Sequence, residues 1–109
     1  LDHMRDTRIL RPVKTVIETP TFAKQVDKIW SEDERLEFVT FIAKNPTAGD
    51  VIPGAEGARK VRWSVSGKGK SGGVRVIYFN QSKGVLYLIA IYRKSVRETM
   101  KSKEIRGAV

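Results

Sequence analysis

The sequence contains no cysteine and a single histidine, His3. Without cysteine the chain has no disulfide, no zinc–thiolate cluster and no thiol nucleophile. Its apolar runs all fall short of the roughly 20 residues that a membrane-spanning helix needs. These absences favour a soluble protein of the cytoplasm with no membrane partner.

Acidic residues are also missing from a long central interval. Between Glu56 and Glu98 there is no Asp or Glu, whereas ten Lys and Arg residues fall there, and the whole chain has a formal net charge of +9. Four acids crowd residues 32–37 instead. Such segregated positive charge favours a polyanionic partner, nucleic acid before membrane.

The 109 residues, of which 40% are hydrophobic, suit one domain with one core. Residues 1–4, Leu-Asp-His-Met, resemble a cloning remnant that would make Met4 the natural start. Together with the arginines that follow, we expect residues 1–12 to be this remnant and a flexible basic arm. The single domain is expected over residues 13–109.

The first half predicts a short strand and two helices. Residues 13–18 are rich in strand formers, and Thr19-Pro20 can cap and open a helix. Ser31 and Glu34 have the spacing of a capping box, which predicts a second helix that ends at Asn45-Pro46. Apolar residues at helical spacing give both helices a core-facing side.

The second half predicts strands. Val61 and Trp63 alternate with Lys60 and Arg62, as in a strand with one buried face. After a glycine-rich basic connection, residues 74–79 and 85–92 form two more strands around a turn at 80–84, and a short basic helix or tail falls within 93–103. The expected fold is α+β, with two N-terminal helices packed on an antiparallel sheet of about four strands whose other face stays open.

A cationic groove is expected on that open face. Lys60 and Arg62 share one side of their strand, and Arg75 can lie across from them on the next. The arginine fork binds two phosphate oxygens, whereas neighbouring cations disfavour the protonated form of Lys60, so that Lys60, or alternatively Lys94, can act as acid or base. Tyr92 can donate a proton or stack on a base, although a tyrosine at the end of a buried strand is more often half core with its hydroxyl in water.

Five further cations are candidate RNA-binding residues. Two of them lie in the glycine-rich connection, where solvated charges and backbone-assisted phosphate contacts both remain open. The five are Arg59, Lys68, Lys70, Arg93 and Arg97.

Four strings of this sequence resemble the HigB-type branch of the RelE/ParE toxin superfamily, and the resemblance extends over about residues 13–100. The strings are Gly49-Asp50-Val51-Ile52-Pro53-Gly54, Gly57-Ala58-Arg59-Lys60-Val61-Arg62, Gly67-Lys68-Gly69-Lys70-Ser71-Gly72-Gly73-Val74-Arg75-Val76-Ile77-Tyr78 and Ile91-Tyr92-Arg93-Lys94. The resemblance implies a RelE-like fold and a ribosome-dependent mRNA endonuclease that inhibits translation and uses no metal or cofactor. It also implies a toxin that is neutralised by a cognate antitoxin carrying a helix-turn-helix DNA-binding domain.

The resemblance implies roles for four residues. Lys60 and Arg62 match the family's basic pair, Arg75 matches the arginine on the next strand, and Lys94 falls near a basic residue after the last strand. Where family members often have an acid and some have a tyrosine, this chain has Val96 and Met100. These departures leave the general acid and base unassigned.

An acid-free site would explain a dependence on the ribosome, because the bare domain would lack a general base near neutral pH. Two alternatives stay open: a ParE-like inhibitor of DNA gyrase without nuclease activity, and a non-catalytic nucleic-acid-binding module. A cluster of phosphate-binding side chains on one sheet face favours RNA cleavage over the gyrase inhibitor. The binding module would fit the charge equally well.

Overall fold

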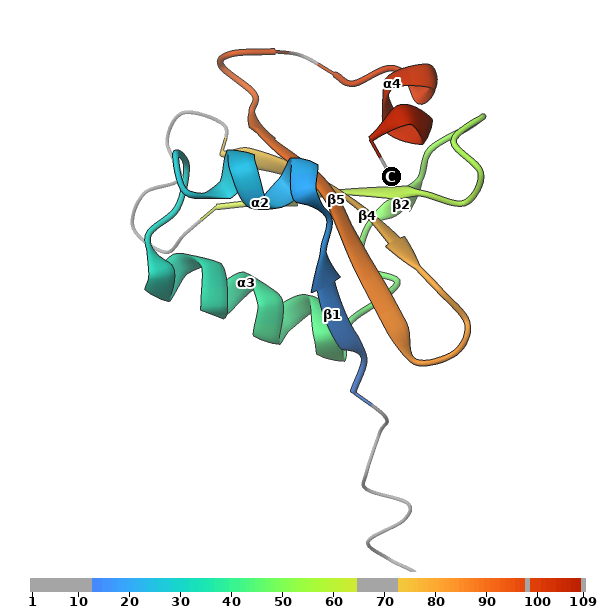
Figure 1. The fold of residues 1–109 in the computed structure, drawn as a ribbon, viewed down its shortest axis with the longest axis horizontal. Helices are drawn as coiled ribbons and strands as arrows, with labels where there is room; N and C mark the ends of the chain where they lie inside the picture. The colour runs from blue at the N-terminus through green and yellow to red at the C-terminus, as the bar shows by residue number, and fades with distance from the viewer. Residues whose placement is uncertain (1–12, 65–72, 98, 109) are drawn as a thin grey trace, which may run out of the picture.

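The computed structural model describes residues 13–64, 73–97 and 99–108, so the arm expected over 1–12 lies outside the described residues. The elements, in chain order, are β1 (Thr15–Glu18), α2 (Pro20–Val26), α3 (Glu32–Lys44), β2 (Asp50–Val51), β3 (Arg59–Trp63), β4 (Val74–Asn80), β5 (Val85–Arg93) and α4 (Ser102–Gly107). Figure 1 shows the sheet with α2 and α3 on one side, which confirms the α+β class. Within the described ranges no helix has the length and apolar character to cross a membrane.

The sheet has five strands in the order β1-β5-β4-β3-β2, one more than expected. β1 pairs with β5 in parallel and the other pairs are antiparallel, so the sheet is mixed rather than purely antiparallel. The additional strand, β2, has only two residues and both are exposed, so it lacks the alternation that marks a strand. The direction of β1 was missed because residue alternation carries no information on strand direction.

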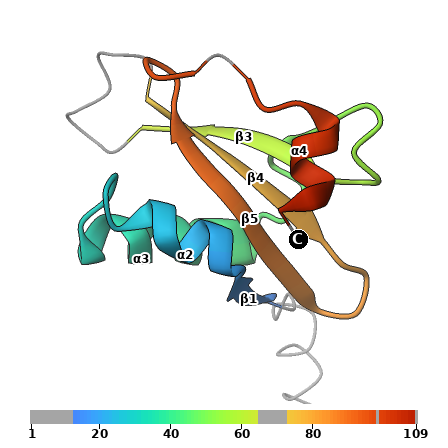
Figure 2. The same ribbon diagram turned by 45° about the horizontal axis from the view of Figure 1, so that its top comes forward.

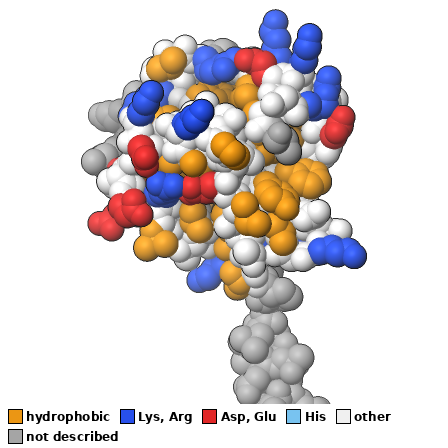
Figure 3. All heavy atoms as spheres, in the orientation of Figure 1, with side chains coloured by type: hydrophobic (Ala, Val, Ile, Leu, Met, Phe, Trp, Pro, Cys, Tyr) orange, Lys and Arg blue, Asp and Glu red, His pale blue; other side chains and the backbone are white. Residues whose placement is uncertain are grey.

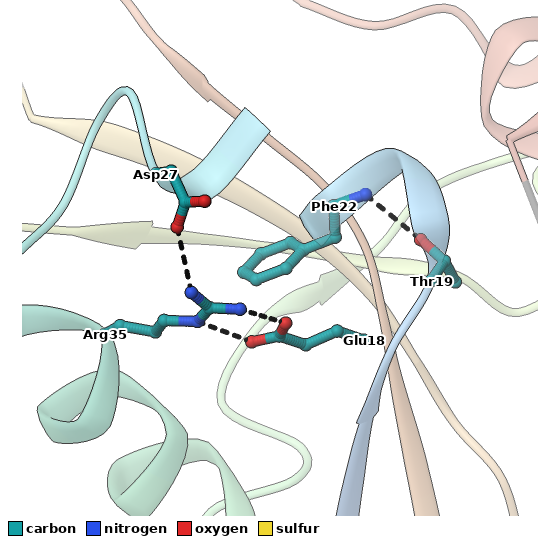
Figure 4. Close-up of polar contacts among 5 residues, drawn as sticks. All are labelled: Glu18, Thr19, Phe22, Asp27 and Arg35. Carbon is teal, nitrogen blue, oxygen red and sulfur yellow. Dashed lines mark hydrogen bonds and ion pairs between the residues drawn. The ribbon is translucent and has the colours of Figure 1, made fainter. Parts of the chain in front are cut away.

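The predicted helix starts are confirmed. The Thr19 hydroxyl accepts a hydrogen bond from the Phe22 amide at 3.2 Å, as Figure 4 shows. Ser31 and Glu34 form the complete capping box at the start of α3, with bonds of 3.2 and 2.8 Å. Both caps satisfy amide groups that have no partner inside the helix.

Arg35 connects the first three elements. Its guanidinium donates in a fork to both carboxylate oxygens of Glu18 at the end of β1, and it donates to Asp27 at the end of α2 at 3.0 Å (Figure 4). A bidentate arginine–carboxylate pair fixes orientation as well as distance. The pair therefore sets how α3 lies against β1.

The core lies on both faces of the sheet. The larger cluster packs α2 and α3 against one face, with Phe22, Phe38 and Ile42 fully buried. On the other face Ile105 of α4 is buried against Ile77 and Ile89, and Figure 2 shows α4 on the side opposite α2 and α3. The expectation of an open second face is therefore wrong for the part under α4, because α4 begins at Ser102, far enough along the chain to fold back over the sheet.

A bulge in β5 decides which side chains face which layer. Ile77 pairs with Ala90 but Tyr78 pairs with Leu88, so Ile89 is the extra residue. Ile89 and Ala90 consequently both face α4, and Tyr92 follows them onto that side. A bulge reverses the alternation beyond it, which in β5 moves Tyr92 to the face that carries Arg75.

Gly49 sits where no side chain fits. Its amide donates to the Tyr78 hydroxyl at 2.8 Å, and that hydroxyl donates to the Pro46 carbonyl at 2.8 Å. A Cβ at Gly49 would lie 2.7 Å from the Lys60 carbonyl oxygen and 2.9 Å from the Tyr78 ring. Glycine allows this close approach of two backbones.

Gly49→Ala is therefore expected to lower the free energy of unfolding by about 2 kcal/mol, because the clash falls mainly on backbone that cannot move aside. Denaturant unfolding measures the change. Gly107→Ala is the matched control, since a Cβ at Gly107 meets no atom within 4 Å. Equal stability of the two variants would contradict the close approach.

Candidate nucleic-acid interface

Three candidate residues lie side by side on the face that carries α4. Arg62 of β3 pairs with Arg75 of β4, and Arg75 pairs with Tyr92 of β5. Lys60 lies two residues before Arg62 on the same strand and so on the same face. The sheet thus presents the predicted basic pair and the predicted arginine as neighbours, as the alternation suggested.

A polar groove of about 700 Å³ opens over these strands. Four of its described lining residues are cations: Lys60, Arg62, Arg75 and Lys94. The other described lining residues are Ala48, Asp50, Val61 and Thr99. Most Lys and Arg side chains visible in Figure 3 also lie on the upper part of the molecule, where α4 lies. The groove volume falls in the range of small-ligand sites, and its charge suits a phosphate-rich ligand.

The groove cations differ in how they are held. The side chains of Lys60, Arg62 and Lys94 make no hydrogen bond or ion pair with any residue in the described ranges. Arg75 is only 6% exposed, so the fold positions it tightly while its side chain still contributes to the groove wall. The groove therefore combines one fixed arginine with three cations that are open to a ligand.

Arg59 and Arg93 have contacts within the chain. Arg59 donates to the Gly49 carbonyl at 2.7 Å, which ties β3 to the loop before β2. Arg93 donates to the carbonyls of Lys28 and Ile29 at 3.4 Å each, after the end of α2. Neither lines the groove, so any contact of theirs with RNA would lie outside it.

Arg97 joins the segment after β5 to α4. It donates to both carboxylate oxygens of Glu104 at 2.9 and 3.0 Å, and its guanidinium lies 5.7 Å from the centre of the Tyr92 ring. Hydrogen bonds from the Lys101 amide and from Arg97 lower the pKa of Glu104. The ion pair between Arg97 and Glu104 keeps α4 near the groove. Arg97 itself does not line the groove.

Tyr92 is 7% exposed and does not line the groove either. Burial raises the pKa of its hydroxyl, and the Thr99 side chain, Arg75 and Arg97 oppose that shift. The hydroxyl is buried and forms no well-aligned hydrogen bond with the described residues. It is therefore protonated at neutral pH, where it can donate a proton but cannot act as a base.

Two polar residues of the described groove lining were not predicted from the sequence. Asp50 belongs to β2 and pairs with Lys60, and Thr99 comes from the segment before α4. The expectation of an acid-free site is wrong, because β2 brings Asp50 from outside the acid-free interval. A predicted hairpin that joins residues 50 and 60 would have placed Asp50 beside Lys60.

Lys68 and Lys70 lie outside the described residues. Within the part of the chain that is described, no group of three or more His, Asp or Glu side chains is placed to hold a metal ion.

No family model matches this sequence. Among solved structures, the fold is similar to that of a mutant of the E. coli toxin RelE in the free state, with a TM-score of 0.57. The two chains are 16% identical, and the match covers 79% of this chain and 88% of the other. The fold is therefore RelE-like.

Proposed function

We propose that the chain is the toxin of a toxin–antitoxin pair and acts in the cytoplasm as a ribosome-dependent mRNA endonuclease of the HigB type. The observation that carries the proposal is the groove on a RelE-like fold, where Lys60, Arg62 and Lys94 lie with Arg75 and their side chains have no partner in the described chain. Surface cations that only maintain solubility need not converge on one groove. Convergence of several cations on one groove suits a phosphodiester.

Each groove cation suits one part of the reaction. Cleavage of RNA by its own 2′-hydroxyl needs alignment of that group, stabilisation of the extra charge on the phosphate and a proton for the leaving 5′-oxygen. Arg62 and Arg75 are neighbours on adjacent strands and suit the phosphate charge. Lys60 or Lys94 suits the proton donor, because the side chains of both are cations with no other partner in the described ranges.

The proposed partners follow from the same groove. Message bound on a ribosome supplies a single strand that is already aligned, which lowers the entropic cost of reaching the reactive geometry. An antitoxin with an acidic segment would cover the four cations and block RNA. In our proposal this antitoxin also carries the helix-turn-helix domain that binds DNA.

The proposal is tested by induced expression in growing cells, with 5′ ends mapped on one message in two forms, one translated and one without its start codon. New ends confined to the translated form support ribosome-dependent cleavage. Growth arrest with both forms intact would overturn it and favour the ParE-like inhibition of gyrase. Binding of free RNA without growth arrest would favour a non-catalytic module.

A further inference from the structure

Among the described lining residues of the groove, every charged side chain except one can only donate hydrogen bonds. Lysine and arginine have no acceptor, whereas a carboxylate has only acceptors. The attacking 2′-hydroxyl must lose a proton, so it needs an acceptor beside it. Among the described lining residues, Asp50 supplies the only carboxylate.

The position of Asp50 is fixed through its backbone. Before it, Gly49 is held on both sides, because its amide donates to Tyr78 and its carbonyl accepts from Arg59. After it, the Ile52 amide donates to the Ala58 carbonyl at 2.9 Å. These bonds hold β2 in register, with Asp50 opposite Lys60.

Asp50 is an exposed residue, and its carboxylate has no hydrogen-bond or ion-pair partner within the described ranges. A carboxylate that served only to neutralise Lys60 would form an ion pair with it, yet no such pair is present among the described residues. A rigid backbone with a free acceptor at the edge of a cationic groove is the arrangement expected of a preorganised base.

We infer that Asp50 is the general base of the reaction, an inference that rests on the proposed function. The Asp50 carboxylate takes the proton of the 2′-hydroxyl while the 2′-oxygen forms a bond to phosphorus. The bond from phosphorus to the 5′-oxygen breaks, and a groove lysine gives its proton to that oxygen. The products are a 2′,3′-cyclic phosphate and a 5′-hydroxyl, and solvent returns both side chains to their starting charge.

Asp50→Asn tests this role, since it keeps the shape and removes the base. Purified protein is added to ribosomes carrying one message, and cleavage is timed in a single turnover at a site mapped with the wild type. We expect the rate to fall at least about 100-fold. Co-sedimentation with ribosomes whose message has deoxyribose at that site should stay within about threefold of the wild type. Glu37→Gln is the control, because it makes the same charge change on the exposed surface of α3.

The outcomes separate the possibilities. Cleavage by Asp50→Asn within about threefold of the wild type would overturn the inference and leave the proposed function standing. A parallel loss of binding and cleavage would also overturn it, because Asp50 would then hold the RNA rather than the proton. If the wild type leaves the message intact while both variants fold normally, the proposed function is wrong. The inference is then wrong as well, because it rests on that function.

Discussion

Replacing Arg62 with alanine is expected to lower the rate of message cleavage by about 100- to 1,000-fold, the usual cost of losing one donor to a transition-state oxyanion. The fold should be unaffected, since the Arg62 side chain is exposed and makes no hydrogen bond with the described residues. Single-turnover cleavage on ribosomes measures the rate, and the thermal transition measures the fold. Arg75 is a poorer first choice because it is buried and helps to pack the sheet.

Two variants give this experiment its controls. Arg62→Lys keeps the charge but loses the fork, so it should recover binding more fully than cleavage. Lys83→Ala removes one cation from the exposed β4–β5 turn, at the opposite end of the hairpin from Arg75, and should cleave normally. If Lys83→Ala and Arg62→Ala lose the same activity, net charge rather than the groove is responsible.

Phe38→Ala is expected to lower the free energy of unfolding by about 3 to 5 kcal/mol, the usual cost of removing a buried phenyl ring. Phe38 is fully buried, and its ring centre lies 5.3 Å from that of Trp30 and 5.2 Å from that of Trp63. It thus packs α3 against the strand that carries Lys60 and Arg62. Such a loss is a large fraction of the roughly 5 to 15 kcal/mol that stabilises a typical domain.

Unfolding in guanidinium chloride, followed by circular dichroism, measures this loss. Leu36→Ala is the matched control on the same helix, because Leu36 is 63% exposed and its truncation should change stability by less than about 0.5 kcal/mol. A small effect of Phe38→Ala would show that the aromatic cluster does not hold α3 on the sheet.

Local patterns predicted most of the fold. The caps at Thr19 and Ser31 each depend on a few neighbouring residues, so their sequence signals were sufficient. The strand alternation around Lys60 and Arg62 was equally local, and it placed both on one face as the structure has them.

Features that depend on distant contacts could not be predicted in this way. β2 is two residues long and is defined only by its pairing with β3, so the groove position of Asp50 was hidden. In β5 nearly every residue is apolar, so the alternation could not show the bulge that moves Tyr92 to the groove side. The sequence also could not show which arginines are paired. Arg97 forms an ion pair with Glu104 of α4, whereas the Arg62 side chain has no ion-pair partner among the described residues. This difference depends on where α4 folds back over the sheet.

The most direct test of the account is the cleavage of a message with deoxyribose in place of ribose at the one mapped site, bound on ribosomes with the purified chain. Without the 2′-hydroxyl there is no nucleophile for the groove to activate, so the ribose message should be cut to a 5′-hydroxyl end and the deoxyribose message should stay intact. Equal cleavage of both messages, or a 5′-phosphate end on the ribose message, would contradict the account.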